Sequence, residues 1–397
     1  MLQRASDGAS PYLELRTCFY MDLQGLIDLF AENFVQFEEL GASVSIWRRG
    51  EQILYLANGY RDRQKRLTWS TQTPVLIWSA TKGLASACLI HAASEHGIEL
   101  NRKIVELWPE YGQNGKKDTT ILHVLTHQAG QPALRNPSVS ILDHDAVVDQ
   151  LAQQEPFWKP GDAHGYHART YGFLVDELVR RITQGTSLDT YFRLIFGEPL
   201  KLDLWIGVPE SIAHEIAPIF APRKTRTPGS EEPFYQALSQ QDSLTRKAFS
   251  TPAGLHSPSM MNDPEIRRHP LPSFGGIGTA EALARFYQTL CSDEIFSTEM
   301  IRRIATTQCA GKDEVLRVDT AYGIGYMKDP VLRGRKARRI FGTSVTGFGQ
   351  PGSGGSLGFC DPENEVAFAY VMNQMEPGLF PNPKSLRLVE HFYETCL

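Results

Sequence analysis

Trp78-Ser79-Ala80-Thr81-Lys82-Gly83-Leu84 is the stretch that decides how this chain is interpreted. It follows an apolar run, residues 74–78, that is typical of a buried segment, and it leads into helix formers with apolar residues at helical spacing. Residues three apart on a helix share a face, so we expect the Ser79 hydroxyl and the Lys82 amine to reach each other. A desolvated lysine can take the hydroxyl proton and turn a serine into a nucleophile.

The position of Ser79 at a helix N-terminus would add free backbone N–H groups, which favour a developing oxyanion. The four-residue pattern is nevertheless common. Taken alone, a helix-capping Ser79 and a solvated Lys82 explain it better than a catalytic pair.

Strands are predicted on both sides of a mainly helical middle. An amphipathic helix over residues 21–40, ended by Gly41, precedes a hairpin of strands at 43–47 and 52–57. The last third has a strand at 321–326, a hairpin of 356–360 with 365–371, and a helix at 385–393. We therefore expect an α+β fold in which both chain ends build one antiparallel sheet flanked by helices, rather than a doubly wound parallel sheet.

This pattern divides the chain into two lobes. Residues 1–80 and 276–397 are predicted to form the sheet lobe, with a helix at 279–290, and residues 81–275 the mainly helical lobe. Helical patterns in the second lobe include residues 119–127, 145–153 and 171–182. Residues 221–275 are rich in proline and irregular, which is typical of a lid, a binding rim or a disordered segment.

Composition excludes several function classes. The 397 residues are 42% hydrophobic and 21% charged, with a net charge of −5 and a pI near 6.1, so nothing favours nucleic acid. The basic run at 333–339 is typical of a solvated hairpin loop. No apolar leader opens the chain and no stretch could span a bilayer, while six cysteines show no framework spacing. A cytoplasmic protein with reduced thiols and no membrane partner is the simplest reading; the oligomeric state is open.

Two later segments join the serine–lysine pair: Pro160-Gly161-Asp162-Ala163-His164-Gly165-Tyr166-His167-Ala168 and Phe348-Gly349-Gln350-Pro351-Gly352-Ser353-Gly354-Gly355-Ser356. With the supporting segments 125–130 and 275–280, they resemble the serine β-lactamase-like superfamily. That superfamily includes class C β-lactamases, penicillin-binding DD-peptidases and, most similar to this chain, family VIII carboxylesterases. The resemblance runs from about residue 41 to 393 and implies a β-lactamase/transpeptidase-like fold.

The resemblance assigns roles to particular residues. Tyr166 corresponds to the tyrosine of the family's Tyr-Ser-Asn motif and would carry the proton from Ser79 to the leaving group, its phenolate stabilised by the Lys82 ammonium. On the residues alone, Tyr166 is better explained as an aromatic packed beside a Pro-Gly turn. The backbone N–H groups of Ser79 and Ser353 would form the oxyanion hole, and Gly352 would let an edge strand lining the cleft approach the acyl group closely.

Two departures from the family pattern bear on the substrate. Ala168 stands where many β-lactamases and DD-peptidases have an asparagine that binds a substrate amide. Gln350 stands where the third motif usually has lysine or histidine, so it brings a hydrogen-bond donor without a charge. Both losses remove contacts useful for penicillins and peptides, and neither is needed for a simple ester. Arg169 could supply a compensating charge.

Rival motifs are weaker. Residues 354–358 match the G-x-S-x-G nucleophile elbow around Ser356, but a strand and a turn follow where that elbow needs a helix. His123 and His127, four apart, and His164 and His167, beside a turn, lack a metal-ligand motif, and a structural, backbone-bonded His127 is expected. No phosphate-binding loop is present. The sequence therefore predicts neither a metal nor a cofactor.

The leading hypothesis is a serine hydrolase that cleaves short- or medium-chain carboxylic esters through an acyl-enzyme. Ser79, Lys82 and Tyr166 are the predicted catalytic residues, and Gln350, Gly352 and Ser353 the predicted substrate-binding residues. A β-lactamase or DD-peptidase, and an acyltransferase using the same residues, stay open as alternatives. A non-catalytic binding protein on the same fold is the alternative from a different class, and the intact Ser79, Lys82 and Tyr166 argue against it.

Overall fold

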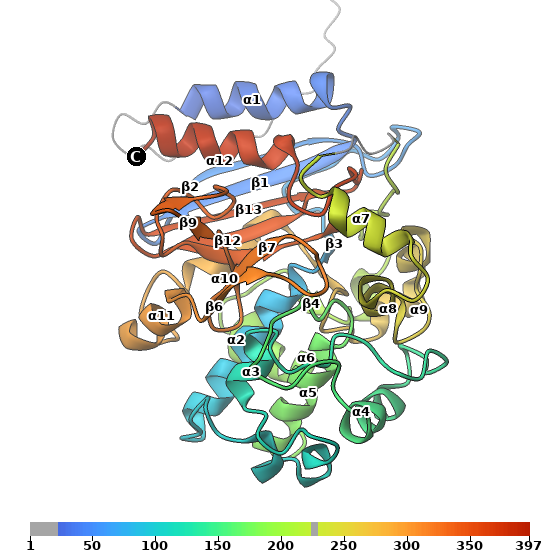
Figure 1. Cartoon of the computed structure of the whole chain (residues 1–397). Coiled ribbons are helices and arrows are strands. Elements are labelled where there is room, and N and C mark those ends of the chain that lie inside the picture. The colour runs from blue at the N-terminus through green and yellow to red at the C-terminus, as the bar shows by residue number, and fades with distance from the viewer. Residues whose placement is uncertain (1–22, 224–228) are drawn as a thin grey trace, which may run out of the picture.

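The structure, a computed structural model, describes residues 23–223 and 229–397 (Figure 1). The strands are β1 (Gly41–Arg48), β2 (Glu51–Gly59), β3 (Val75–Trp78), β4 (Leu204–Ile206), β5 (Gly276–Gly278), β6 (Cys309–Lys312), β7 (Asp319–Tyr322), β8 (Met327–Lys328), β9 (Val331–Leu332), β10 (Arg335–Lys336), β11 (Phe348–Pro351), β12 (Leu357–Asp361) and β13 (Val366–Met372). The α-helices are α1 (Leu23–Gln36), α2 (Thr81–Glu95), α3 (Ile121–Leu125), α4 (His144–Gln153), α5 (Tyr171–Ile182), α6 (Leu188–Phe192), α7 (Glu232–Ser239), α8 (Leu244–Ser250), α9 (Pro264–Arg268), α10 (Ala280–Gln288), α11 (Thr298–Ala305) and α12 (Pro383–Thr395).

Strands from both ends of the chain form one antiparallel sheet in the order β2-β1-β13-β12-β11-β8-β7-β6. The β1–β2 hairpin turns at Arg49 and Gly50, which both have positive φ, as a tight hairpin turn requires. β1 then pairs with β13, with Ala42 opposite Met372. The predicted α+β fold, with mixed helices and an antiparallel sheet built from both chain ends, is confirmed.

Helices cover both faces of this sheet. α1 and α12 lie side by side on one face, and α10 packs against β1, β12 and β13 on the other (Figure 1). Every residue of β13 is buried, which explains why its sequence is continuously apolar rather than alternating. This apolar layer pairs with β12, the strand that follows the third family-like motif.

The mainly helical part of the molecule is built around α2. Nearly all of its residues are buried, because α2 packs against α5 and α6 and also touches β11 of the large sheet (Figure 1). A helix that is apolar on all sides belongs in an interior. α2 therefore joins the helical part to the sheet, and its N-terminus lies where the two meet.

A second, smaller sheet in the order β3-β5-β4 carries the chain into α2. Val75 pairs with Gly278, and Leu204 pairs with the same glycine from the other side. A side chain at Gly278 would collide with Leu204, so glycine lets the three strands pack closely. These pairings fix the position of β3, the strand that leads directly to Ser79.

Three predicted elements differ from the structure. The predicted helix 21–40 ends at Gln36, and Gly41 begins β1 instead of capping the helix; residues 21 and 22 lie outside the described residues. The predicted strand 321–326 is broken after Tyr322, because Gly325, at φ +80°, turns the chain toward β8. Residues 229–275 of the irregular segment contain the short helices α7, α8 and α9.

The basic run at 333–339 lies partly on a hairpin, β9–β10, as expected. Not all of it is solvated. Lys336 is nearly buried and pairs with Asp329 at 2.9 Å, and Arg338 lies 3.9 Å from the Phe380 ring centroid. The local sequence shows that such a run is charged, but it does not show which carboxylate or aromatic ring each charged side chain contacts.

Within residues 23–223 and 229–397, no helix combines the length and the apolar character needed to cross a membrane. The predicted lobe boundaries and the predicted cytoplasmic location stay predictions.

Candidate active site

Ser79 lies in a two-residue turn between β3 and α2, and its side chain is partly exposed. Trp78 has a φ of +51°, which bends the chain sharply just before the serine. The turn is held by Thr81, whose hydroxyl donates to the Trp78 carbonyl at 2.5 Å and accepts from the Gly276 N–H at 2.8 Å. Ser79 is not a helix cap, since α2 begins at Thr81 without a side-chain cap.

Lys82 is buried, with 1% of its surface exposed, so the solvated-lysine explanation is wrong. Its Nζ donates to the carbonyls of Ala168 at 2.8 Å and Ser273 at 2.7 Å, and it lies 3.4 Å from Ser79 Oγ. Burial lowers the pKa of Lys82 well below its usual range. A neutral amine has two N–H donors and one lone pair, so with both donors on carbonyls the lone pair is left for the Ser79 hydroxyl.

Tyr166 lies on the other side of this pair. Lys82 Nζ is 4.8 Å from the centroid of its ring, and the Ser79 hydroxyl is near enough to lower the pKa of its phenol. Burial raises the pKa of Tyr166; the Ser79 hydrogen bond partly offsets this, and the nearby Asp313 charge adds to it. Both shifts act against the expected phenolate stabilised by an ammonium, because they favour the neutral amine and the neutral phenol.

Gln350 joins the site from β11. Its Nε2 donates to the Tyr166 phenolic oxygen at 3.3 Å and to its own neighbour, the Pro351 carbonyl, at 3.4 Å. Only 2% of Gln350 is exposed. The predicted substrate-binding glutamine is thus in contact with Tyr166.

The glycine-rich motif continues as a turn, not as an edge strand. Pro351 ends β11, which lies between β12 and β8, and Ser353–Gly355 form the 3₁₀ turn η6 with Gly354 at φ +85°. The expected close approach is nevertheless present at Gly352, where a β-carbon would collide with the Ile77 carbonyl oxygen. Gly352 therefore brings Ser353 toward the turn that holds Ser79.

The backbone N–H groups of Ser79 and Ser353 have no hydrogen-bond acceptor in the part of the chain that the structure describes. Ser79 is half-buried and Ser353 is exposed, so both residues border solvent. Two unpaired donors beside a candidate nucleophile can serve a substrate oxygen, as the resemblance implies for an oxyanion hole.

The histidines are engaged with the protein itself. His127 accepts the His167 N–H at Nδ1 (3.1 Å), which confirms its predicted structural role. His167 accepts the Gln131 N–H at Nε2 (3.0 Å), so its other nitrogen, Nδ1, donates to the Gly165 carbonyl at 2.7 Å. His123 forms a reciprocal cap with Thr120.

Arg169, the residue that could have compensated for the missing cation, is used elsewhere. Its guanidinium donates to the carbonyls of Phe249 and Gly254 and lies 5.4 Å from the Phe274 ring centroid. Phe274 in turn stacks on Trp78, with ring centroids 6.4 Å apart. The residue before Ser79 in the chain, Trp78, therefore belongs to an aromatic stack, and the Arg169 guanidinium is held by backbone carbonyls.

Ser356, the rival nucleophile, is fully buried and is followed by β12 instead of a helix. Its carbonyl accepts the Gly352 N–H at 2.7 Å. It belongs to the turn that shapes the third motif and lacks the exposed position that a nucleophile elbow provides.

Two contributors to the site were missed from the sequence. Ser273 holds Lys82 through its backbone carbonyl, which any residue could supply, so no side-chain signal existed. Asp313 accepts the Tyr166 N–H with both carboxylate oxygens, at 3.0 and 3.1 Å, from 147 residues away. An isolated aspartate at such a separation carries no motif.

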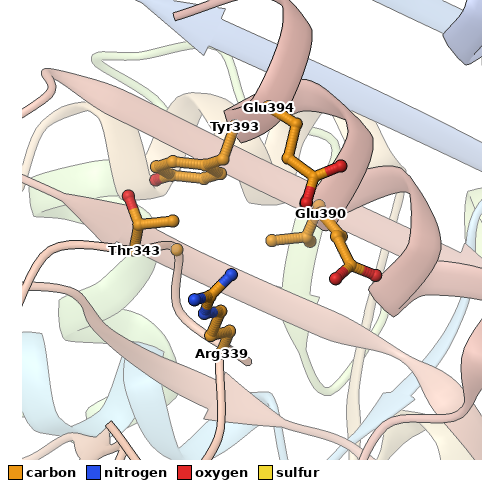
Figure 2. Close-up of a pocket in the computed structure, with 7 residues that line it drawn as sticks. Arg339, Thr343, Glu390, Tyr393 and Glu394 are labelled. Atoms are coloured by element: carbon orange, nitrogen blue, oxygen red, sulfur yellow. The ribbon is translucent and has the colours of Figure 1, made fainter. Parts of the chain in front are cut away.

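A separate pocket lies on the sheet lobe, between the loop at 339–343 and α12 (Figure 2). Arg339, Thr343, Glu390, Tyr393 and Glu394 point toward it in Figure 2, and no predicted site residue lines it. Its carboxylates do not form a metal-binding group: no cluster of three or more His, Cys, Asp or Glu side chains suited to a metal ion occurs in residues 23–223 and 229–397.

Comparison with known proteins gives one consistent result. The family model described as Beta-lactamase matches residues 30–390. The chain is 30% identical to the esterase/beta-lactamase LipL of Mycobacterium tuberculosis over 364 residues, 88% of this chain and 81% of that protein. A family VIII carboxylesterase structure aligns with a TM-score of 0.83 and 29% identity, covering 97% of this chain and all of the other. A penicillin-binding protein homolog from Caulobacter crescentus aligns with a TM-score of 0.84 and 30% identity, covering 98% of this chain and all of the other.

Proposed function

The chain belongs to the beta-lactamase family and is a hydrolase of that fold, and from this premise we propose that it is a carboxylesterase that cleaves short- and medium-chain esters through an acyl-enzyme on Ser79. The observation that carries the proposal is the set of contacts around Lys82. A buried amine whose two N–H donors are taken by carbonyls and whose third direction faces Ser79 Oγ at 3.4 Å is arranged as a base.

In the proposed reaction, Ser79 Oγ attacks the ester carbonyl carbon and Lys82 takes its proton. The oxyanion that forms is stabilised by the unpaired N–H groups of Ser79 and Ser353. Collapse of the tetrahedral intermediate expels the alcohol, which takes a proton from the Tyr166 hydroxyl while Lys82 returns its proton to the phenolate. Water then attacks the acyl-serine by the same proton path in reverse, releasing the carboxylic acid and restoring Ser79.

The preference for uncharged esters rests on what borders the site. Gln350 supplies an amide and no charge, Ala168 supplies no side-chain amide, and the guanidinium of Arg169 is held by backbone carbonyls. A penicillin or a peptide acid brings a carboxylate that would find no paired cation here. The aromatic pair of Trp78 and Phe274 favours an apolar substrate instead.

The descriptions of similar proteins support ester hydrolysis and point to β-lactam hydrolysis as the main alternative activity. One solved relative is described as a family VIII carboxylesterase, another as a penicillin-binding protein homolog, and the mycobacterial relative is described as an esterase/beta-lactamase. β-Lactam hydrolysis is therefore the alternative that the experiment must measure alongside ester hydrolysis.

The test is to assay a series of p-nitrophenyl esters, from acetate to decanoate, beside a chromogenic cephalosporin, using wild type and Ser79→Ala. We expect kcat/KM to peak at a short or medium acyl chain, to exceed the value for the cephalosporin, and to vanish in Ser79→Ala. Faster hydrolysis of the cephalosporin than of any ester would replace this proposal with a β-lactamase. Added alcohol acceptors would reveal acyl transfer as ester products.

A further inference from the structure

Asp313 is a fully buried carboxylate that the proposed reaction does not use. It lies just after β6 and forms no ion pair with any residue that the structure describes. Its oxygens accept only neutral donors: the N–H groups of Tyr166, Val315 and Leu316 and the hydroxyls of Thr320 and Tyr322. Burying a carboxylate without a cation is unfavourable, so this arrangement needs a local reason.

The reason lies in the segment that carries Tyr166. Three consecutive backbone N–H groups there are all taken: Gly165 donates to the His127 carbonyl at 3.0 Å, Tyr166 donates to both Asp313 oxygens, and His167 donates to His127 Nδ1 at 3.1 Å. His127 thus holds the residues on either side of Tyr166, and Asp313 holds Tyr166 itself. A two-oxygen acceptor fixes the direction of that N–H better than a single oxygen does.

Asp313 is itself fixed from the sheet side. Its Oδ1 accepts from Val315 at 2.9 Å and Leu316 at 2.7 Å, which closes a turn between β6 and β7. Its Oδ2 accepts from Tyr322 Oη at 3.1 Å, and the Tyr322 ring lies 4.8 Å from the ring of His127. The carboxylate therefore connects β7 of the large sheet to the loop that carries the phenol.

We infer that Asp313 is a positioning residue: it holds the backbone of Tyr166 so that the phenolic oxygen meets Gln350 at 3.3 Å and stays beside Ser79. The inference rests on the proposed function, because it assigns Asp313 a role through Tyr166 in ester hydrolysis. Burial raises the pKa of Asp313, and in its charged form it would raise the pKa of the Tyr166 phenol, which acts in the same direction. Asp313 does not touch the reacting atoms.

The test compares Asp313→Asn and Asp313→Ala with wild type on p-nitrophenyl butyrate. Asparagine keeps one side-chain oxygen, which can still accept from the backbone N–H groups. It replaces the other oxygen with an NH2 group, which can donate to the hydroxyls of Thr320 and Tyr322. We expect kcat to fall about tenfold in Asp313→Asn and about a hundredfold in Asp313→Ala, as expected for a catalytic group displaced by about 1 Å. KM should change less than about threefold in both. Titrating active sites with a fluorophosphonate makes kcat refer to folded enzyme only.

Asp329 supplies the matched control. It is also buried and accepts two backbone N–H groups, from Ile340 at 3.2 Å and Phe341 at 3.1 Å, but it touches none of the catalytic residues. Asp329→Asn should lower the melting temperature and leave kcat per labelled site within about twofold of wild type. Asp313→Asn should lower both.

A double-mutant cycle separates positioning from general loss of structure. If Asp313 acts through the Tyr166 hydroxyl, then adding Asp313→Asn to Tyr166→Phe should lower kcat no further. The inference is overturned if Asp313→Asn keeps kcat within twofold of wild type, or if it lowers kcat equally with and without the Tyr166 hydroxyl. A wild-type enzyme without ester hydrolysis would instead overturn the proposed function.

Discussion

The amide of Gln350 donates to the phenolic oxygen of Tyr166 across 3.3 Å, between two side chains that are both buried. The amide occupies a lone pair of that oxygen, so the phenolic proton is free to point toward Ser79 or a leaving group. Because the Gln350 amide is neutral, it does not stabilise a phenolate as a cation would, and it offers no charge to a substrate. In the proposed function, this one contact links the preference for uncharged esters to the path of the proton.

The first prediction concerns that contact. Gln350→Lys combined with Ala168→Asn should raise kcat/KM for a cephalosporin relative to p-nitrophenyl butyrate by about tenfold to a hundredfold, the size of a charged hydrogen bond of about 1.5–3 kcal/mol. Steady-state kinetics of both substrates measures the ratio, and Gln350→Met with Ala168→Asn, which lacks the cation, is the control. An unchanged ratio would mean that neither residue sets the preference.

Ser79 should be the only residue that a fluorophosphonate labels. It is partly exposed at the turn before α2, whereas Ser356 is fully buried. Peptide mass spectrometry should find one adduct, on Ser79, and none in Ser79→Ala. Ser356→Ala, which removes a buried hydroxyl, should still be labelled at the wild-type stoichiometry. An adduct on Ser356 would favour the elbow interpretation.

Lys82→Ala and Tyr166→Phe should each lower kcat about a hundredfold to ten-thousandfold, the usual effect of removing a positioned acid or base. The double variant should be little worse than the worse single variant, because the two side chains handle one proton. Lys328→Ala is a matched control: Lys328 is also buried and donates to two carbonyls, those of Val345 and Gly347, away from Ser79. It should lower stability and spare kcat.

The pH dependence of kcat/KM tests which group is the base. Burial lowers the pKa of Lys82 well below its usual range, and only the neutral amine can accept the Ser79 proton. Activity on a neutral ester should therefore fall as pH drops through that lowered pKa and level off above it. Lys82→Arg, whose guanidinium stays charged, should be inactive throughout. A profile that rises toward acidic pH would exclude Lys82 as the base.

Acid should destabilise the fold through buried histidines. Burial lowers the pKa of His167 to about 3, against about 6.5 for an unfolded histidine. Between these values only the unfolded chain binds the proton, so the free energy of unfolding falls as pH drops, by about 1.4 kcal/mol per pH unit for this group. Urea unfolding at pH 4–7 should show a weaker dependence of the free energy of unfolding on pH in His167→Gln than in wild type.

The outline of the fold could be predicted because its signals are local. Alternating and apolar runs placed the β1–β2 and β12–β13 hairpins, and a helical pattern placed α5 at its observed bounds. Three ordered motifs predicted the family, which the comparisons confirm. The break after Tyr322 was missed although Gly325 marks it in the sequence, whereas the early end of α1 depends on Gly41 joining β1, which the pattern of nearby residues does not show.

The proposed catalytic residues Ser79, Lys82 and Tyr166 could be listed from motifs, but their protonation chemistry could not. The Ser79–Lys82 spacing predicts contact, whereas the lowered pKa of Lys82 depends on burial and its position depends on the carbonyls of Ala168 and Ser273, which no sequence pattern encodes. Asp313 contacts Tyr166 only because β6 and β7 return to that loop. The pKa of a buried group, and its contacts with residues far away in the sequence, are set only when the chain is packed.

The pairing of β1 with β13 also constrains how the protein is made. Ala42 and Met372 are opposite each other yet about 330 positions apart; at 5–20 residues per second a ribosome needs roughly 15–65 seconds to pass from one to the other. Throughout that interval the nascent β1–β2 hairpin carries Val44 and Ile46, which the finished core buries, beside an open edge. During synthesis β1 therefore keeps an unpaired edge until β13 has been made, and this is a stage at which a chaperone can bind.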